Sequence, residues 1–238
     1  MKKNCFCWVI SALCASCASE YCIEGSSTVS RLDGRTLYVK VPQASEWVCI
    51  DSSEVVHGSF RMEGRVDSTV IASLFVGDDY VMPLVIEKGN IQLNIDNAGM
   101  TVKGTPLNNR FNDFMMKKNA LDDRAYEVER TESRMIMDGS TPEEVRREVE
   151  RQRRQLGVDV DNLAKRFIQE NYDNVLGPGV FLMFCNGLPY PMMTPVMEEI
   201  IGGAPETFRN HPQIKDFLHL ARENMRKMEE LKRTSVGG

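Results

Sequence analysis

The sequence has 238 residues, of which 42% are hydrophobic and 26% are charged, and its net charge is −5. This length is enough to bury one sizeable core, and the composition excludes a disordered chain and a multi-span membrane protein. The sequence contains no run of about 18 apolar residues, which is the length that a membrane-spanning helix needs. The acidic balance argues against a nucleic-acid partner, because phosphate binding depends on clustered Lys and Arg.

The N-terminus has the pattern of a bacterial export signal. Lys2 and Lys3 form a short basic region, and an apolar run follows from Phe6 to Ala15. A run of this length suits the core of a signal peptide and is too short to cross a bilayer. Small residues then precede Cys17. This arrangement resembles a lipobox, in which the peptidase cuts before a cysteine that carries a diacylglyceryl group.

We therefore expect residues 1–16 to be a lipoprotein signal peptide and Cys17 to be the lipidation site. The protein would then be a membrane-anchored lipoprotein of the cell envelope, on the periplasmic face or the cell surface. Cys14 departs from the lipobox, which usually has leucine at that position. Cleavage by the ordinary signal peptidase after Ala18 or Ser19, or retention of the N-terminus, are the alternatives.

Four of the seven cysteines belong to the leader and its cleavage site, which leaves Cys22, Cys49 and Cys185 in the body. None of these three has a His or Cys neighbour at metal-ligand spacing, so we expect three free, buried thiols. A Cys22–Cys49 disulfide is the alternative, because both residues lie in predicted strands and an envelope is oxidising. Cys14 and Cys17 have the spacing of a redox pair, but they straddle the expected cleavage site.

Residues 17–104 are predicted to form an antiparallel β-sandwich-like domain. Short segments of alternating polarity, such as Leu37–Val41 and Ile91–Ile95, are typical of strands with one buried face. Turns that contain residues tolerant of positive φ separate these segments. The expected strands are Tyr21–Ser26, Thr36–Val41, Glu46–Ser52, Ser59–Val66, Thr69–Val76, Tyr80–Glu87, Asn90–Asp96 and Gly99–Lys103.

Residues 105–234 are predicted to be all-helical, which makes the fold class α+β. Apolar residues from Phe111 to Val128 recur at helical spacing. Thr141-Pro142-Glu143-Glu144 has the pattern of a capping box at the start of a second helix, which we expect to be interrupted near Gly157. A last helix is expected from Pro212 to Leu231.

Several motifs occur in the order found in a known domain family. They are Tyr21-x-Ile23-x-Gly25, Leu32–Val39, Ile50–Ser52, Gly58–Gly64, Pro83–Ile91 and Val102–Asn108. Over residues 21–109 the sequence resembles the β-rich domain of unknown function (DUF4369-like) that begins many envelope lipoproteins of Bacteroidetes. The stretch through Phe167–Asn174 is similar in layout. In many relatives these parts precede a thioredoxin-like domain, but this sequence has no Trp-Cys-x-x-Cys, so no redox residues carry over.

The arginine-rich run Glu143–Gln155 does not indicate a nucleic-acid site. Its residues form the pairs Glu143–Arg147, Arg146–Glu150 and Glu150–Arg154, each four positions apart. This spacing is typical of a solvated helix face on which opposite charges pair with one another.

Other polar residues are weak candidates for a site. His219 lies three residues after Asp216 and four before Glu223, which would give a metal only one nitrogen ligand. His57 is expected to be a turn residue, and Asp51 is either a binding residue or a strand terminator. The sequence contains no Gly-x-Ser-x-Gly, no His-Glu-x-x-His and no phosphate-binding glycine loop. We predict no catalytic residue, no metal site and no cofactor.

The segment Leu176–Gly203 is rich in Gly, Pro and Met, and its Gly177-Pro178-Gly179 lacks the lysine of a phosphate loop. Met and aromatic side chains among prolines can form an adaptable apolar binding surface. A packed loop that closes the helical region over the sheet is the alternative. The candidate partner surface consists of Leu188, Tyr190, Met192 and Met193.

These observations favour a non-catalytic envelope lipoprotein that acts as a binding or assembly module for an unknown protein or small-molecule partner. An accessory factor for an envelope thiol–disulfide exchange system, without its own redox site, is the second hypothesis. Oligomerisation through the helical region is the third.

Overall fold

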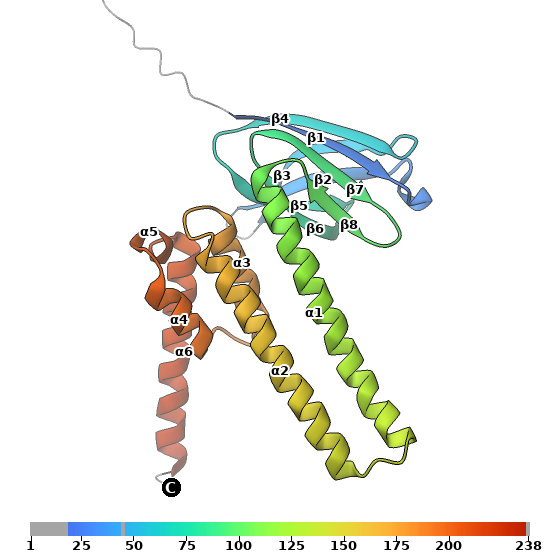
Figure 1. Cartoon of the computed structure of the whole chain (residues 1–238). Coiled ribbons are helices and arrows are strands. Elements are labelled where there is room, and N and C mark those ends of the chain that lie inside the picture. Colours follow the sequence, from blue (N-terminus) through green and yellow to red (C-terminus); the bar gives the residue numbers. More distant parts are fainter. Residues whose placement is uncertain (1–18, 44–45, 237–238) are drawn as a thin grey trace, which may run out of the picture.

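The computed structural model of the chain describes residues 19–43 and 46–236, so the expected signal peptide and Cys17 lie outside the described residues. It confirms the α+β fold, in which a β-sandwich precedes a helical region (Figure 1). The strands are β1 Ser19–Ser27, β2 Thr36–Gln43, β3 Glu46–Glu54, β4 Ser59–Val66, β5 Val70–Val76, β6 Asp79–Ile86, β7 Gly89–Ile95 and β8 Met100–Lys103. The helices are α1 Pro106–Met137, α2 Pro142–Gln169, α3 Leu176–Asn186, α4 Pro195–Gly203, α5 Glu206–Arg209 and α6 Pro212–Val236, with a short 3-10 turn, η1, at Ser30–Leu32.

The sandwich consists of two four-stranded sheets with the strand orders β4-β1-β7-β8 and β3-β2-β5-β6. Alternate residues of both sheets point inward, so that Ile23, Leu37 and Ile91 are completely buried in a shared core. All neighbouring strands are antiparallel except β1 and β7, which are parallel. The expectation of an antiparallel domain is therefore corrected at this pair, because the chain builds the whole second sheet before β7 returns beside β1.

One buried asparagine joins the helical region to the sandwich. In the first turn of α1, Asn108 accepts the N–H of Val85 at 2.9 Å and donates to the carbonyl of the same residue at 2.7 Å. The side chain thereby satisfies backbone groups on β6, which is an edge strand. The Glu87 carboxylate accepts the N–H groups of Leu107 and Asn108 at 2.8 and 3.1 Å. These groups are free at the start of a helix, where a negative charge is also favourable.

The turn before α1 requires a glycine. Gly104 has φ of +99°, and a Cβ at this position would lie 2.4 Å from the carbonyl oxygen of Asn90. The Gly104 N–H donates to the Asn109 side chain at 3.0 Å, and Thr105 accepts a hydrogen bond from Asn108 at 2.8 Å. These contacts give a structural reason for the Val102–Asn108 motif.

The helices α1 and α2 form a hairpin that extends away from the sandwich (Figure 1). The predicted capping box is confirmed, because the Thr141 hydroxyl accepts the Glu144 N–H at 3.4 Å and the Glu144 carboxylate accepts the Thr141 N–H at 2.9 Å. The predicted interruption near Gly157 is wrong, since α2 runs continuously to Gln169. Gly157 lies on the exposed face, and packing of the opposite face maintains the helix.

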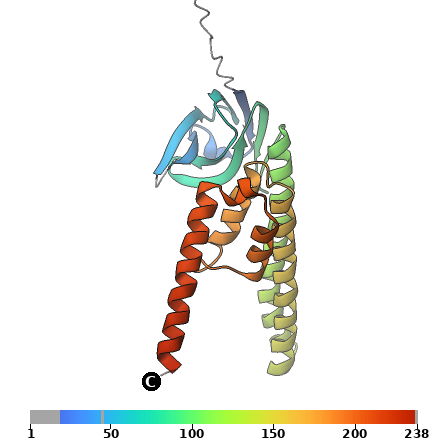
Figure 2. The same ribbon diagram turned by 90° about the vertical axis from the view of Figure 1, so that its left-hand side faces the viewer.

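The Gly-, Pro- and Met-rich segment contains two helices that its composition did not indicate. Gly177-Pro178-Gly179 lies in the first turn of α3, where proline is tolerated because its missing N–H would have no partner. A Cβ on Gly177 would lie 2.3 Å from the carbonyl oxygen of Asn171. The buried Asn171 is itself fixed by Arg110 at 2.8 Å and by the carbonyl of Phe167 at 2.7 Å. Figure 2 shows α3, α4 and α5 between the α1–α2 hairpin and α6.

Candidate functional site

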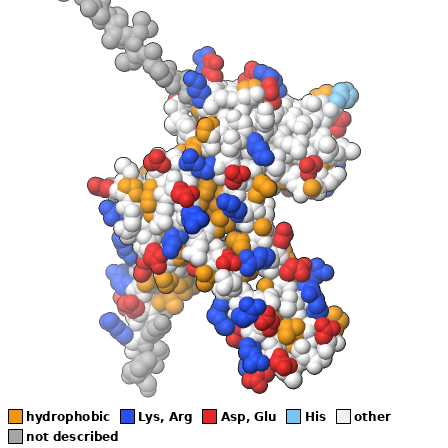
Figure 3. Space-filling model, in the orientation of Figure 1, with side chains coloured by type: hydrophobic (Ala, Val, Ile, Leu, Met, Phe, Trp, Pro, Cys, Tyr) orange, Lys and Arg blue, Asp and Glu red, His pale blue; other side chains and the backbone are white. Residues whose placement is uncertain are grey.

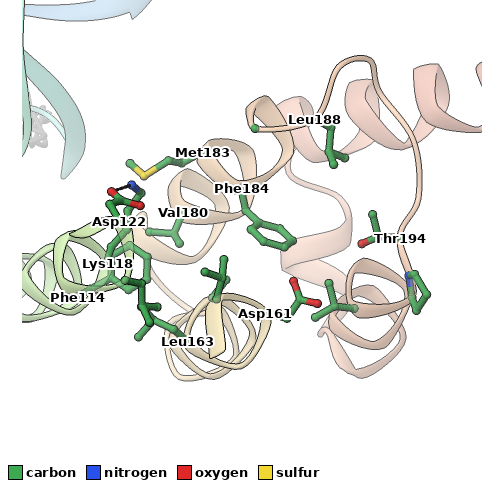
Figure 4. Close-up of a pocket in the computed structure, with 16 residues that line it drawn as sticks. Phe114, Lys118, Asp122, Asp161, Leu163, Val180, Met183, Phe184, Leu188 and Thr194 are labelled. Atoms are coloured by element: carbon green, nitrogen blue, oxygen red, sulfur yellow. Dashed lines mark hydrogen bonds and ion pairs between the residues drawn. The ribbon is translucent and has the colours of Figure 1, made fainter. Parts of the chain in front are cut away.

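The helical region contains a pocket of about 470 Å³ between α1, α2, α3 and the start of α4 (Figure 4). Side chains from all four elements line it, and most of them are apolar. Apolar side chains are also visible between the helices just below the sandwich in Figure 3. The wall includes Phe114, Leu163, Val180, Met183, Phe184 and Leu188.

The pocket borders a well-packed part of the helical core. Phe114 of α1 lines the pocket and packs against Phe167 of α2, with ring centroids 4.4 Å apart. Val180 faces the pocket, whereas the neighbouring Phe181 is fully buried against Phe208 and Phe217. The helix α3 is therefore apolar on more than one side, because one side enters the core and another faces the pocket.

Charged groups occupy two opposite ends of the pocket. At one end, beside Met183, the Lys118 ammonium bonds the Asp122 carboxylate at 2.6 Å (Figure 4). At the other end, the Asp161 carboxylate lies on the side of Thr194. Among the described residues, Asp161 has no hydrogen-bond or ion-pair partner.

The environment of Asp161 is unusual for a carboxylate. Burial raises its pKa, and the nearby Lys165 opposes this effect only in part. The Lys165 ammonium bonds the Glu199 carboxylate at 2.9 Å instead. Asp161 therefore loses water without gaining a partner from the chain.

The structure brings one residue of the predicted partner surface into this pocket. Leu188 lines it, and Thr194 and Pro195 of the same segment do so as well. Met193 packs against the helical core instead, Met192 is half-buried, and the exposed Tyr190 contacts the Met228 sulfur at 3.2 Å. The loop thus directs these side chains to different neighbours, and their role as a partner surface stays a prediction.

Sequence reasoning missed Asp161, although a signal was present. It lies three and seven residues before Ala164 and Ile168, two buried residues of α2. An acidic residue in the buried stripe of an amphipathic helix is uncommon without a partner. The other residues of the wall have no such signal, because the sequence pattern of a pocket wall is the same as that of a core.

Asp51 has a structural role between the two sheets. Its carboxylate accepts the Tyr21 hydroxyl at 3.0 Å, so that β3 of one sheet is joined to β1 of the other. Burial and this carboxylate raise the pKa of Tyr21. His57 has φ of +51° and forms a two-residue turn with Gly58, as predicted. Within the described ranges, no three His, Cys, Asp or Glu side chains are grouped so that they could hold a metal ion.

The three body cysteines are free, so the Cys22–Cys49 disulfide does not form. The expectation that all three are buried is wrong. Cys22 is half-buried on the outer side of β1, Cys49 is exposed on the edge strand β3, and Cys185 alone of these three lies in the core. Burial raises the pKa of the Cys185 thiol to about 12, and partial burial also raises that of Cys22. Both shifts disfavour the reactive thiolate.

The arginine-rich helix face is solvated and partly self-paired. Of the predicted pairs, Glu150–Arg154 forms at 3.6 Å. A pair that was not predicted, Glu148–Arg151, forms at 2.6 Å. The pairs Glu143–Arg147 and Arg146–Glu150 do not form among the side chains that the structure describes. Acidic and basic side chains are interspersed over the face shown in Figure 3.

None of the described helices combines the length and the apolar character that crossing a membrane requires. Residues 21–111 match the model of the family described as Domain of unknown function (DUF4369), which confirms the domain family expected from the motifs. Residues 139–167, within the α1–α2 hairpin, match the model described as Protein of unknown function (DUF3618). The comparisons with curated proteins and with solved structures give no match.

Proposed function

We propose that this protein is a non-catalytic binding module of the cell envelope and that the pocket of the helical region is its ligand site. The observation that carries the proposal is a pocket of about 470 Å³ whose lining is mostly apolar and comes from α1, α2, α3 and the start of α4. Small-molecule sites are typically apolar concavities of roughly 300–1,000 Å³ with a few polar groups.

The leader supports the proposed location. A basic start, an apolar run and Cys17 after small residues are the elements of a lipoprotein signal. The resemblance of the β-rich domain to envelope lipoproteins of Bacteroidetes points to the same setting. A lipid on Cys17 would place the sandwich, which begins at β1, nearest to the membrane anchor along the chain.

The accessory role in thiol–disulfide exchange is the less favoured proposal. The raised pKa values of Cys22 and Cys185 leave neither thiol activated at neutral pH. A partner with its own redox site would have to supply the chemistry. Crosslinking in envelope extracts tests this alternative. The accessory role predicts that a thioredoxin-like protein is recovered with this chain.

Binding of N-phenyl-1-naphthylamine, a neutral apolar dye that fluoresces in apolar sites, tests the proposed pocket. The full chain carrying Cys17→Ser is used without detergent, so that neither acyl chains nor micelles compete for the dye. Val160→Phe adds a ring to the pocket wall, and Val158→Phe adds the same ring at a position of α2 that is 53% exposed.

We expect saturable dye binding that Val160→Phe weakens at least about tenfold and Val158→Phe leaves unchanged, because a bulky ring fills the cavity only at position 160. Thermal unfolding of both variants shows whether weaker dye binding results from a filled pocket or from an unfolded chain. Equal dye binding by the two folded variants, or no binding by the parent chain, would contradict the proposal.

A further inference from the structure

The charges of the pocket lining are unequally satisfied. Lys118 and Asp122 neutralise each other at one end, and Asp161 at the other end adds a negative charge without a partner among the described side chains. The lining therefore carries one net negative charge, surrounded by apolar groups such as Val180 and Phe184. In such surroundings a charge interacts more strongly with a ligand than it would in bulk water.

The start of α4 does not convert this end of the pocket into an anion site. Helix N-termini usually bind anions through free N–H groups. Here Pro195 has no N–H, and the Thr194 hydroxyl already accepts the Met197 N–H at 3.4 Å. Glu198 adds another negative charge to the first turn. An anionic amphiphile would therefore meet carboxylates and few donors.

Lys165, whose charge acts on Asp161, is already paired with another carboxylate. Lys165 lies one turn further along α2, but its ammonium bonds Glu199 of α4 at 2.9 Å. Burial raises the pKa of Asp161, as expected for a carboxylate that has lost water without a compensating partner. A ligand ammonium would provide that partner and would favour the ionised carboxylate.

We infer that the pocket selects ligands that combine an apolar body with a positively charged amine, and that the amine pairs with Asp161. This inference rests on the proposed function and specifies the chemical class of its ligand. The apolar body would lie between Phe114, Val180 and Phe184, and the ammonium would lie at the Asp161 end. Thr194 lies on the same side, where its hydroxyl oxygen can accept a second hydrogen bond from the ammonium.

Three probes with the same chain length separate the effect of the ligand's charge on affinity from the effect of its apolar contacts. n-Octylamine, n-octanol and octanoate are compared at pH 7 by displacement of N-phenyl-1-naphthylamine from the full chain carrying Cys17→Ser. Asp161→Asn keeps the shape of the side chain and removes its charge. Asp216→Asn makes the same change in net charge at an exposed position of α6 and is the control.

We expect octylamine to bind at least about tenfold more tightly than octanol, and octanoate to bind most weakly, because charge-assisted hydrogen bonds are the stronger ones. Asp161→Asn should reduce the preference for octylamine over octanol to less than about threefold, whereas Asp216→Asn should retain it. If Asp161→Asn does not bind the dye, its octanol affinity is measured directly by calorimetric titration, and it should stay near that of the parent chain.

The possible failures are distinguishable. Octanol and octylamine binding equally well would overturn the inference and leave the proposed pocket intact. An octylamine preference that survives Asp161→Asn would overturn the role of Asp161. Absence of binding by the dye and by all three probes would overturn the proposed function itself.

Discussion

Asn108 of α1 and Val85 of β6 are joined by two hydrogen bonds, of 2.9 and 2.7 Å, which pair one side-chain amide with both backbone groups of one edge residue. Both residues are almost completely buried. The same contact protects the edge of β6 and fixes the direction in which α1 leaves the sandwich. The position of the pocket wall on α1 depends on this direction.

Asn108→Ala should therefore destabilise the protein by about 2–4 kcal/mol, because it leaves a buried N–H and a buried carbonyl without partners. Urea unfolding followed by circular dichroism measures the change. Asn119→Ala, at an exposed position of the same helix, is the control and should change stability by less than about 0.5 kcal/mol. Equal stabilities of the two variants would show that the Asn108 contact does not hold the two regions together.

Acid should weaken the helix α2 through Glu148, whose hydrogen-bond partners lie one turn later in the same helix. Hydrogen bonds from Arg151 and Gln152 lower the pKa of Glu148 to about 2 from its ordinary 4.5. A depressed pKa in the folded state means that the contribution is complete above about pH 4.5 and is lost as the pH falls towards 2. Because Glu148 is partly accessible to solvent and Arg151 is exposed, salt should reduce the effect.

The measurement is the melting temperature between pH 2 and 6 for the parent chain and for Glu148→Gln. The variant should show a shallower decline below pH 4.5 than the parent. Glu132→Gln, at an exposed position of α1, should decline as the parent does. If Glu148→Gln follows the parent at every pH, the Glu148–Arg151 pair contributes nothing to stability.

Cys17→Ser should abolish membrane attachment. Acyl chains contribute about 0.8 kcal/mol per buried methylene, and several chains on one cysteine outweigh repulsion between an acidic body and anionic lipids. Detergent phase partition and mass spectrometry of the mature N-terminus provide the measurement. The parent should enter the detergent phase, and the variant should remain uncleaved or be released. An unmodified parent that begins at Ser19 or Glu20 and stays in the aqueous phase would refute the lipid anchor.

Alternation of polarity, together with the turn residues between the segments, placed each strand to within two residues at either end. It could not reveal that β7 returns parallel to β1, since pairing between distant segments leaves no local pattern. Gly177-Pro178-Gly179 resembled a loop for a related reason. The close approach of α3 to Asn171 is a tertiary requirement that overrides local propensity.

The candidate site was predicted less well than the fold. The sequence indicated the segment that contains Leu188, because prolines, Met and Tyr gather there, but the segment contributes only part of the pocket. The wall on α1 and α2 comes from helix stripes that look like ordinary core. Asp161 differs from that pattern. Its lack of a paired cation depends on the contact of Lys165 with Glu199, which lies on a helix distant in sequence.

The most direct test of the central claim is methyl NMR of the full chain carrying Cys17→Ser, with the methionine methyl groups labelled with ¹³C. Met183 lines the pocket, whereas Met100 is 38% exposed on β8 of the sandwich. Met183→Leu assigns the first signal and Met100→Leu the second. On titration with octylamine, we predict that the Met183 signal shifts and saturates while the Met100 signal stays constant. A Met183 signal that does not move at saturating probe, or a larger shift at Met100, would contradict ligand binding in the helical pocket.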